Sequence, residues 1–194
     1  MPRGLLFLGF LIAACSTAES DAAVRDDSAG RRDSIAAVAA STMSEPAVIG
    51  LLALDNAADS AIGSIGYAKA STREIKDFGI MISREHMALR RDILGTARDL
   101  GLTVSDPPAP PAAPPPELRA AVDSASVGRA WDNAYLTLAI AAHEASLENL
   151  ARAYAATKSP EIRKYIDRSA PIVQKHLEKA KRLQSGASNA KNAR

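Results

Sequence analysis

The 194-residue chain is poor in several residue types, and each shortage narrows the class of protein. A single cysteine, Cys15, excludes an internal disulfide. Aromatic residues make up 4% of the chain and hydrophobic residues 47%, a balance that favours close-packed, alanine-rich helices over a β-sheet core. The formal net charge of +2 is too balanced for a nucleic-acid-binding surface, so we expect no nucleic-acid partner.

The N-terminus has an apolar run that is too short to span a membrane. Arg3 precedes eleven mostly apolar residues, Gly4–Ala14, whereas a membrane-spanning helix needs about 20. Residues 1–14 are therefore predicted to be a signal peptide. The run ends in Ile12-Ala13-Ala14-Cys15, which resembles a bacterial lipobox, whose cysteine is lipidated and begins the mature protein. The alternative is an ordinary cleavage site with an incidental cysteine.

The lipobox resemblance implies a place in the cell. Ser16 follows the cysteine where an aspartate would imply retention in the inner membrane, so the resemblance implies an outer-membrane lipoprotein facing the periplasm. Its membrane partner would be reached through the N-terminal lipid, since acyl chains contribute about 0.8 kcal/mol per buried methylene. Residues 15–44 have almost no large apolar side chains, and we expect a flexible tether there.

Four long helical segments follow, and three of them have a recognisable start. Ser44 and Pro46 open the first, and the capping-box pattern Ser71-Thr72-Arg73-Glu74 opens the second. Ser159-Pro160-Glu161 opens the fourth, in which Pro171 should cause a kink or an outward bend. The predicted ranges are about 46–70, 71–101, 129–157 and 160–184, with a short helical piece at 117–124 and a disordered tail at 186–194.

The second and third long helices are separated by a proline-rich connection. Residues 106–116 contain seven prolines in eleven positions, which excludes a helix and predicts an extended crossover. A spacer is the simpler interpretation, and a recognition motif for a proline-binding partner is the alternative. Because the connection is long, the helices it joins need not be hairpin neighbours. The predicted fold class is all-α, a four-helix bundle over residues 45–185 that buries the apolar stripe of each helix.

The three histidines lie on three different predicted helices, each on the apolar stripe. His86 shares a helix face with Ile82 and Leu89, and His143 and His176 lie on equivalent stripes of the third and fourth helices. Asp59 lies on the stripe of the first helix. Three imidazoles and one carboxylate are thus predicted to point inward from four helices.

These residues belong to short spaced motifs that resemble domain-of-unknown-function family 4142, described as predicted outer-membrane proteins with a ferritin-like bundle. The resemblance spans Ile49–Leu183, and the motifs that carry it are Glu74-Ile75-Lys76-Asp77-Phe78, Arg84-Glu85-His86, Asp132-Asn133-Ala134-Tyr135, His143-Glu144, and Pro171 with His176-Leu177. Two features depart from the family pattern: Asp59 stands where the family commonly has glutamate, and the connection at 106–116 is unusually rich in proline. The resemblance implies a ferritin-like fold and an envelope location, and no established reaction.

Three roles are open for the histidines. They could bind a transition metal together with Asp59, because imidazole suits zinc, copper, iron and nickel. They could instead be structural, each paired with Asp59, Asp132, Tyr135 or a backbone carbonyl along the inner seam. A pH-sensing role is the third. Imidazole nitrogens within about 4–5 Å of a common point would favour metal, and separate heights with separate partners would favour the structural role.

A di-iron centre is not predicted. It needs a glutamate three residues before each of two histidines, and the corresponding positions hold Ser83, Ile140 and Val173. The neighbouring acids of the three histidines, namely Glu85, Glu144 and Glu178, should project mostly out of the core.

The sequence contains no phosphate-binding loop, nucleophile elbow or catalytic cysteine in the helical domain, so an enzyme is not favoured. The leading hypothesis is a lipid-anchored envelope protein that binds or scaffolds without catalysis. The alternative is a metal-binding or metal-sequestering protein that uses the inward histidines. The basic end of the fourth helix, Lys175 to Arg182, is expected to be a solvated face, with anionic lipid or cell-wall polymer as the alternative partner.

Overall fold

A computed structural model describes residues 43–192 of the chain and the side chains up to residue 186. The predicted signal peptide, the lipidation site at Cys15 and nearly all of the tether lie outside the described residues. Within that range the protein is all-α, with no strand and five helices: α2 (Glu45–Lys69), α3 (Arg73–Asp99), α4 (Pro116–Ser124), α5 (Arg129–Ala156) and α6 (Pro160–Asn192).

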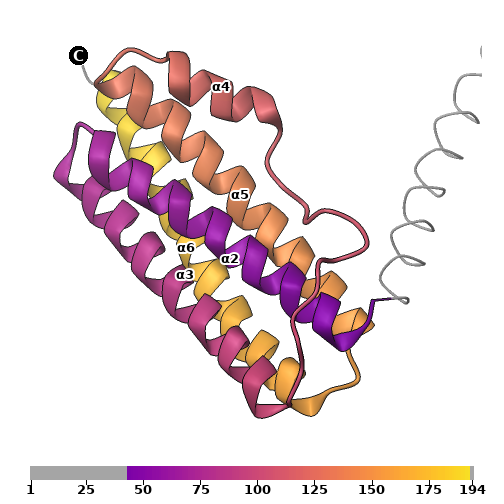
Figure 1. The fold of residues 1–194 in the computed structure, drawn as a ribbon. Coiled ribbons are helices and arrows are strands. Elements are labelled where there is room, and N and C mark those ends of the chain that lie inside the picture. The colour runs from indigo at the N-terminus through magenta and orange to yellow at the C-terminus, as the bar shows by residue number, and fades with distance from the viewer. Residues whose placement is uncertain (1–42, 193–194) are drawn as a thin grey trace, which may run out of the picture. The chain divides into compact units, whose positions relative to one another are not determined.

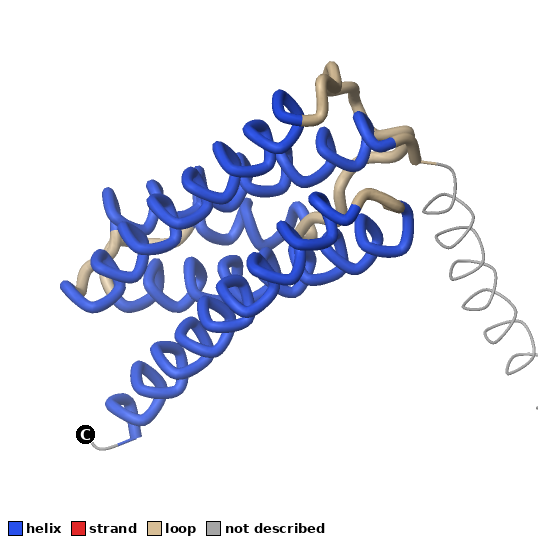
Figure 2. The backbone as a smooth tube through the Cα atoms, turned by 90° about the horizontal axis from the view of Figure 1, so that it is seen from below, coloured by secondary structure: helices blue, strands red, loops and turns tan. Residues whose placement is uncertain are grey.

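The helices begin close to where the sequence predicts. Ser159 Oγ accepts a hydrogen bond from the Ile162 N–H and caps α6, as expected. The cap of α3 differs by one residue: Thr72 Oγ1 accepts from the Ile75 N–H, while Ser71 binds the distant Asp132 instead. The last helix extends to Asn192, beyond the predicted end near Gln184. In Figure 2 this final part of α6, next to the C-terminus, extends past the other helices.

The four long helices pack side by side in a ring, in the order α2, α3, α6, α5 (Figure 1). Helices α2 and α3 form one antiparallel hairpin, and α5 and α6 form the other. Between them the proline-rich segment returns along the outside of α2 and α5, so that α5 starts at the same end as α3 (Figure 1). As expected from its length, this connection leaves the helices that it joins as non-neighbours, since α3 packs on α2 and α6.

The two helices of the first hairpin touch through glycines. A Cβ atom built on Gly79 would lie 2.5 Å from the Tyr67 backbone nitrogen, and one on Gly63 would lie 2.7 Å from the Gly79 carbonyl oxygen. Only glycine permits backbones to approach this closely. Among the described helices, α2 alone is long and apolar enough to cross a membrane. However, 61% of its most apolar 18-residue stretch is buried inside the protein. A buried core helix passes the same test of length and composition.

Two apolar clusters fill the interior, one toward each end of the ring of helices. One contains Leu52, Leu89 and Val173, and the other contains Ile82 and Ala139. His86 stands between Ile82 and Leu89 on α3, so a polar layer separates the clusters. The buried polar residues of the described chain are Asp55, Asn56, Asp59, His86, Asp132, His143, Ser146, Asn149, Thr157, Ser169 and His176.

Candidate metal centre

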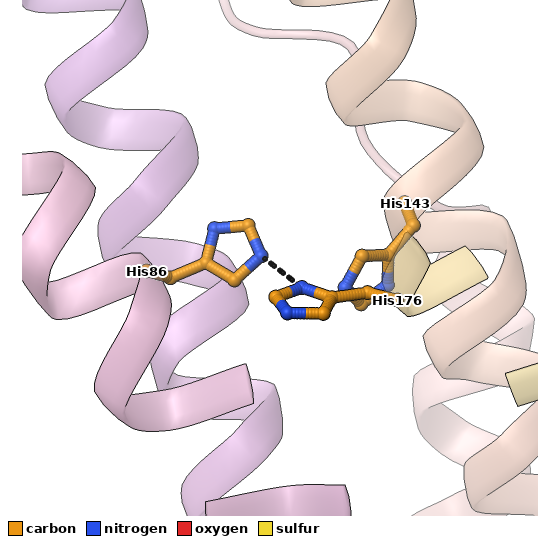
Figure 3. Close-up of side chains that lie close together, drawn as sticks. All are labelled: His86, His143 and His176. Carbon is orange, nitrogen blue, oxygen red and sulfur yellow. Dashed lines mark hydrogen bonds between the residues drawn. The ribbon is translucent and has the colours of Figure 1, made fainter. Parts of the chain in front are cut away.

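His86, His143 and His176 meet in the middle of the protein. Figure 3 shows the three rings facing one another from α3, α5 and α6. All three side chains are fully buried, and one ring nitrogen of each lies within 4.8 Å of those of the other two. The ring centroids are 5.2 to 5.4 Å apart. The imidazole nitrogens are therefore as close together as a shared metal ion requires, and the three histidines together could hold one.

Each histidine has a hydrogen-bond acceptor on the side away from the centre. His86 Nδ1 lies 3.0 Å from Asn56 Oδ1, and His143 Nδ1 lies 2.6 Å from the Ala139 carbonyl oxygen. His176 Nε2 lies 2.8 Å from Glu85 Oε2. A carbonyl, amide or carboxylate oxygen accepts only, so each of these outer nitrogens carries the proton. Ligating histidines in metalloproteins have this same arrangement of outer partners.

The orientation of the Asn56 amide, on which the His86 tautomer depends, is set by its own contacts. Asn56 Nδ2 donates to the Leu52 carbonyl oxygen at 2.7 Å and to the Tyr165 hydroxyl at 3.0 Å. A carbonyl oxygen cannot donate, so the amide nitrogen must face Leu52 and the amide oxygen must face His86. The proton of neutral His86 is thereby fixed on Nδ1, and Nε2 has a free lone pair.

The inner nitrogens are consequently unprotonated. His86 Nε2 and His176 Nδ1 lie 3.3 Å apart, with no proton between them when each outer nitrogen holds its own. His143 Nε2 is buried and has no hydrogen-bond partner among the described residues. Three lone pairs therefore face one small volume. A buried acceptor without a donor costs about 1–3 kcal/mol, and a cation in this volume would remove that cost.

Asp59, on α2, lies close to one of the three histidines. Its Oδ2 atom lies 3.6 Å from His86 Nε2 and accepts a hydrogen bond of 2.6 Å from Ser146 Oγ. The residue is 3% exposed, and burial raises the pKa of its carboxyl group to about 6. Three imidazoles and one carboxylate thus lie near one another on four different helices.

Burial also keeps the histidines neutral. It lowers the pKa of His86 to about 2, with further contributions from His143 and His176. The pKa values of His143 and His176 are lowered for the same first reason. Neutral imidazole is the form that binds metal, and protons are weak competitors for these nitrogens near neutral pH.

The predicted seam residues Asp132 and Tyr135 lie in the protein interior, but neither pairs with a histidine. The Asp132 carboxylate accepts hydrogen bonds from the Ser71 N–H, at 2.8 Å, and from the Ser71 hydroxyl. Tyr135 stacks on Trp131 with ring centroids 5.2 Å apart, and its hydroxyl has no hydrogen-bond partner in the described part of the chain. Asp132 thus links the start of α5 to the loop before α3, and both residues lie outside the histidine cluster.

The expectation that the neighbouring acids point away from the core is wrong for one of the three. Glu144 and Glu178 are exposed and pair with Lys181 and Arg182. Glu85 is half-exposed, yet its flexible side chain bends back to His176. The position of Glu85 around the helix axis does not decide where its carboxylate lies, because the long glutamate side chain can reach back toward a neighbouring helix.

Sequence reasoning did not find a second buried carboxylate near the histidines. Asp55, one helical turn before Asp59, is 7% exposed and accepts hydrogen bonds from Ser146 Oγ at 3.1 Å and Asn149 Nδ2 at 2.7 Å. Burial and the nearby charge of Asp59 raise its pKa to about 7. The spacing of Asp55 and Asp59, four residues apart, was the available signal.

The fold and this centre define an all-α protein with a buried three-histidine cluster. The sequence model of the family described as "Domain of unknown function (DUF4142)" matches residues 31–183, and the chain belongs to that family. No curated protein and no solved structure matches the chain.

Proposed function

We propose that this protein binds one divalent transition-metal ion through His86, His143, His176 and Asp59. The observation that supports it is the set of three inner nitrogens that face one point without a proton while each outer nitrogen is held by its own acceptor. A purely structural role has no use for His143 Nε2, which lacks a partner within the described residues. A pH-sensing role fits poorly with histidines whose pKa values are lowered by burial.

The ligand set suits zinc first. A tetrahedral ion with metal–nitrogen bonds of about 2.0–2.1 Å has ligand atoms about 3.3 Å apart. His86 Nε2 and His176 Nδ1 already have this separation, 3.3 Å, and Asp59 Oδ2 is 3.6 Å from the first of them. The widest nitrogen pair, within 4.8 Å, contracts on binding. Copper and nickel accept the same ligands, whereas a di-iron centre requires more carboxylates facing the site.

We propose binding, storage or sequestration of metal in place of catalysis, so the geometry favours the second of the two hypotheses drawn from the sequence. The four protein ligands leave no open coordination position on a tetrahedral ion, as in structural or storage sites, and catalytic zinc keeps one position for water.

For the fold, we propose the ferritin-like type of four-helix bundle. Two antiparallel hairpins joined by one long crossover are characteristic of that type. The crossover between α3 and α4 and the ring order of the long helices support this assignment.

For the location, we propose an outer-membrane lipoprotein anchored at Cys15, on the strength of Ile12-Ala13-Ala14-Cys15 in the sequence. The variant Cys15→Ser should move the protein from the membrane fraction to the soluble periplasmic fraction. A variant that stays in the membrane fraction as the wild type does would refute the lipid anchor, and the metal centre would be unaffected by that result.

Metal content after refolding tests the proposed function. The full chain is refolded from denaturant with zinc, copper, nickel or iron in separate experiments, passed over a desalting column and analysed for each element. We expect about one equivalent of zinc or copper per chain, and a loss of that equivalent in His143→Leu. Binding of none of the four metals would overturn the proposal. Retention of one full equivalent by the variant would show that the ion sits elsewhere.

A further inference from the structure

A cavity of about 270 Å³ lies between the proline-rich crossover and α2, and Asp59, which is close to His86, is one of its lining residues. Residues Pro110–Pro114 line one side and α2 the other, and Ala142, the neighbour of His143, also lines it. Leu54, which is 46% exposed, stands at its outer edge. Water occupies about 30 Å³ per molecule in the liquid, so the cavity has room for several water molecules.

Two buried carboxylates connect this cavity to the metal centre. Asp55 and Asp59 both line it, and Asp59 also lies 3.6 Å from His86 Nε2. Ser146 Oγ contacts both carboxylates, at 3.1 Å and 2.6 Å. Within residues 43–192, neither carboxylate forms an ion pair with a lysine or arginine. A row of polar groups therefore extends from the cavity through Asp55 and Asp59 to the imidazoles. Asp55 and Asp59 are about 6 Å apart along the axis of α2.

The crossover that covers the cavity is held by side chains of α5. Asn149 binds the backbone of Ala112 twice: its Oδ1 accepts from the Ala112 N–H at 2.8 Å, and its Nδ2 donates to the Ala112 carbonyl at 2.9 Å. The same Nδ2 donates to Asp55. Arg152 adds a longer contact of 3.4 Å to the Pro110 carbonyl oxygen. Asn149 thus links the cover of the cavity to the carboxylate inside it.

We propose that this cavity is the access route by which a hydrated divalent metal ion reaches the histidines, that Asp55 is the group that first receives the ion, and that Pro110–Pro114 is the cover that opens for exchange. This rests on the proposed function, because it needs an ion at the three histidines. Asp55 is not a ligand of the final site, since it lies one turn from Asp59 and already accepts two hydrogen bonds. On the way in, the Asp55 carboxylate replaces part of the water around the ion, and the ion then moves one helical turn along α2 to Asp59.

Exchange kinetics with Co²⁺ test the route. Cobalt in a tetrahedral site absorbs visible light, so stopped-flow mixing follows loading, and excess EDTA follows release. In Asp55→Asn we expect association and dissociation to slow together, by about tenfold or more, with the dissociation constant within about threefold of wild type. A group on the path lowers the barrier in both directions, whereas a ligand or an attracting charge would change the equilibrium.

A second variant moves the rates in the opposite direction. Asn149→Ala removes both bonds to Ala112, so loading and release should become faster together. Asp123→Asn is the matched control, because Asp123 is a half-exposed carboxylate on α4 paired only with Arg119, and its rates should equal those of wild type. Glu85→Gln tests the other approach to the site, from the outer side of His176.

The outcomes separate the two proposals. Unchanged rates in Asp55→Asn and Asn149→Ala, or slowing in both directions in Glu85→Gln alone, would overturn the route while leaving the metal site intact. Slower association with faster release in Asp55→Asn would also overturn it and make Asp55 part of the binding site. A wild-type protein that gives no cobalt absorption would overturn the proposed function, and the route with it.

Discussion

Replacing His143 by leucine should lower the stability of the protein much more in the presence of metal than in its absence. In the metal-free protein, His143 Nε2 is a buried acceptor without a partner in the described residues, at a cost of about 1–3 kcal/mol. The replacement also removes the Nδ1 hydrogen bond to Ala139, worth about 0.5–1.5 kcal/mol. That carbonyl keeps its helical bond in α5, so no new unpaired group arises.

The balance of these two effects sets the expected magnitude. Without metal, the variant should lie between about 0.5 kcal/mol less stable and about 2.5 kcal/mol more stable than wild type. With zinc at about 100 times its dissociation constant, wild type should gain about 2.7 kcal/mol and the variant almost nothing.

The assay is urea unfolding at pH 7.5, in EDTA and in buffered zinc, with helical circular dichroism as the signal. At this pH the histidines of the unfolded chain are mostly neutral, so proton uptake does not distort the comparison. A variant more than about 2 kcal/mol less stable in EDTA would refute the reasoning, because His143 would then be a structural residue whose contacts hold the core together. Equal zinc stabilisation of both proteins would refute the ligand assignment.

Three further predictions test other parts of the structure. Metal-free protein should lose stability as the pH falls below about 6.5, because the unfolded chain protonates histidines whose folded pKa values are lowered. The raised pKa values of Asp55 and Asp59 act in the opposite sense and reduce this loss, and urea unfolding that shows no loss between pH 6.5 and 5 would contradict the prediction. Gly79→Ala should lower the melting temperature strongly, because its Cβ would lie 2.5 Å from a backbone nitrogen, whereas Gly95→Ala, with its nearest contact at 3.5 Å, should stabilise by about 0.5–1 kcal/mol; equal effects would argue against the close helix contact. Asp132→Ala should cost about 1.5–3 kcal/mol in urea unfolding, since it removes both acceptors of Ser71, and a change under about 0.5 kcal/mol would show that this link is not formed.

Local signals in the sequence predicted the helices well. Ser159 and Pro160 define the start of α6 by chemistry that acts within one turn, and the prolines of 106–116 exclude a helix whatever surrounds them. Ser71 shows the limit of such signals. Ser71 fits the sequence pattern of an N-cap, but its hydroxyl donates a hydrogen bond to Asp132, 61 residues away. Thr72 is therefore the residue that caps α3.

The inward direction of the histidines could be predicted from helical spacing, but their common height could not. Height depends on how far each helix slides along its neighbours, and that follows from packing such as the glycine contact between α2 and α3. The outer partners were missed for a related reason. Asn56 and its partner His86 lie on different helices, and so do Glu85 and its partner His176. Only the packing of these helices brings the side-chain oxygens of Asn56 and Glu85 to the ring nitrogens.

X-ray absorption of the zinc-loaded protein tests the central claim most directly. Its fine structure reports the atoms bound to the metal and their distances. The structure predicts three imidazole nitrogens and one carboxylate oxygen at about 2.0–2.2 Å, with the outer-shell scattering that imidazole rings give, and a loss of one imidazole in His143→Leu. A first shell of oxygen atoms alone, without imidazole scattering, would contradict the assignment of His86, His143 and His176 as the ligands.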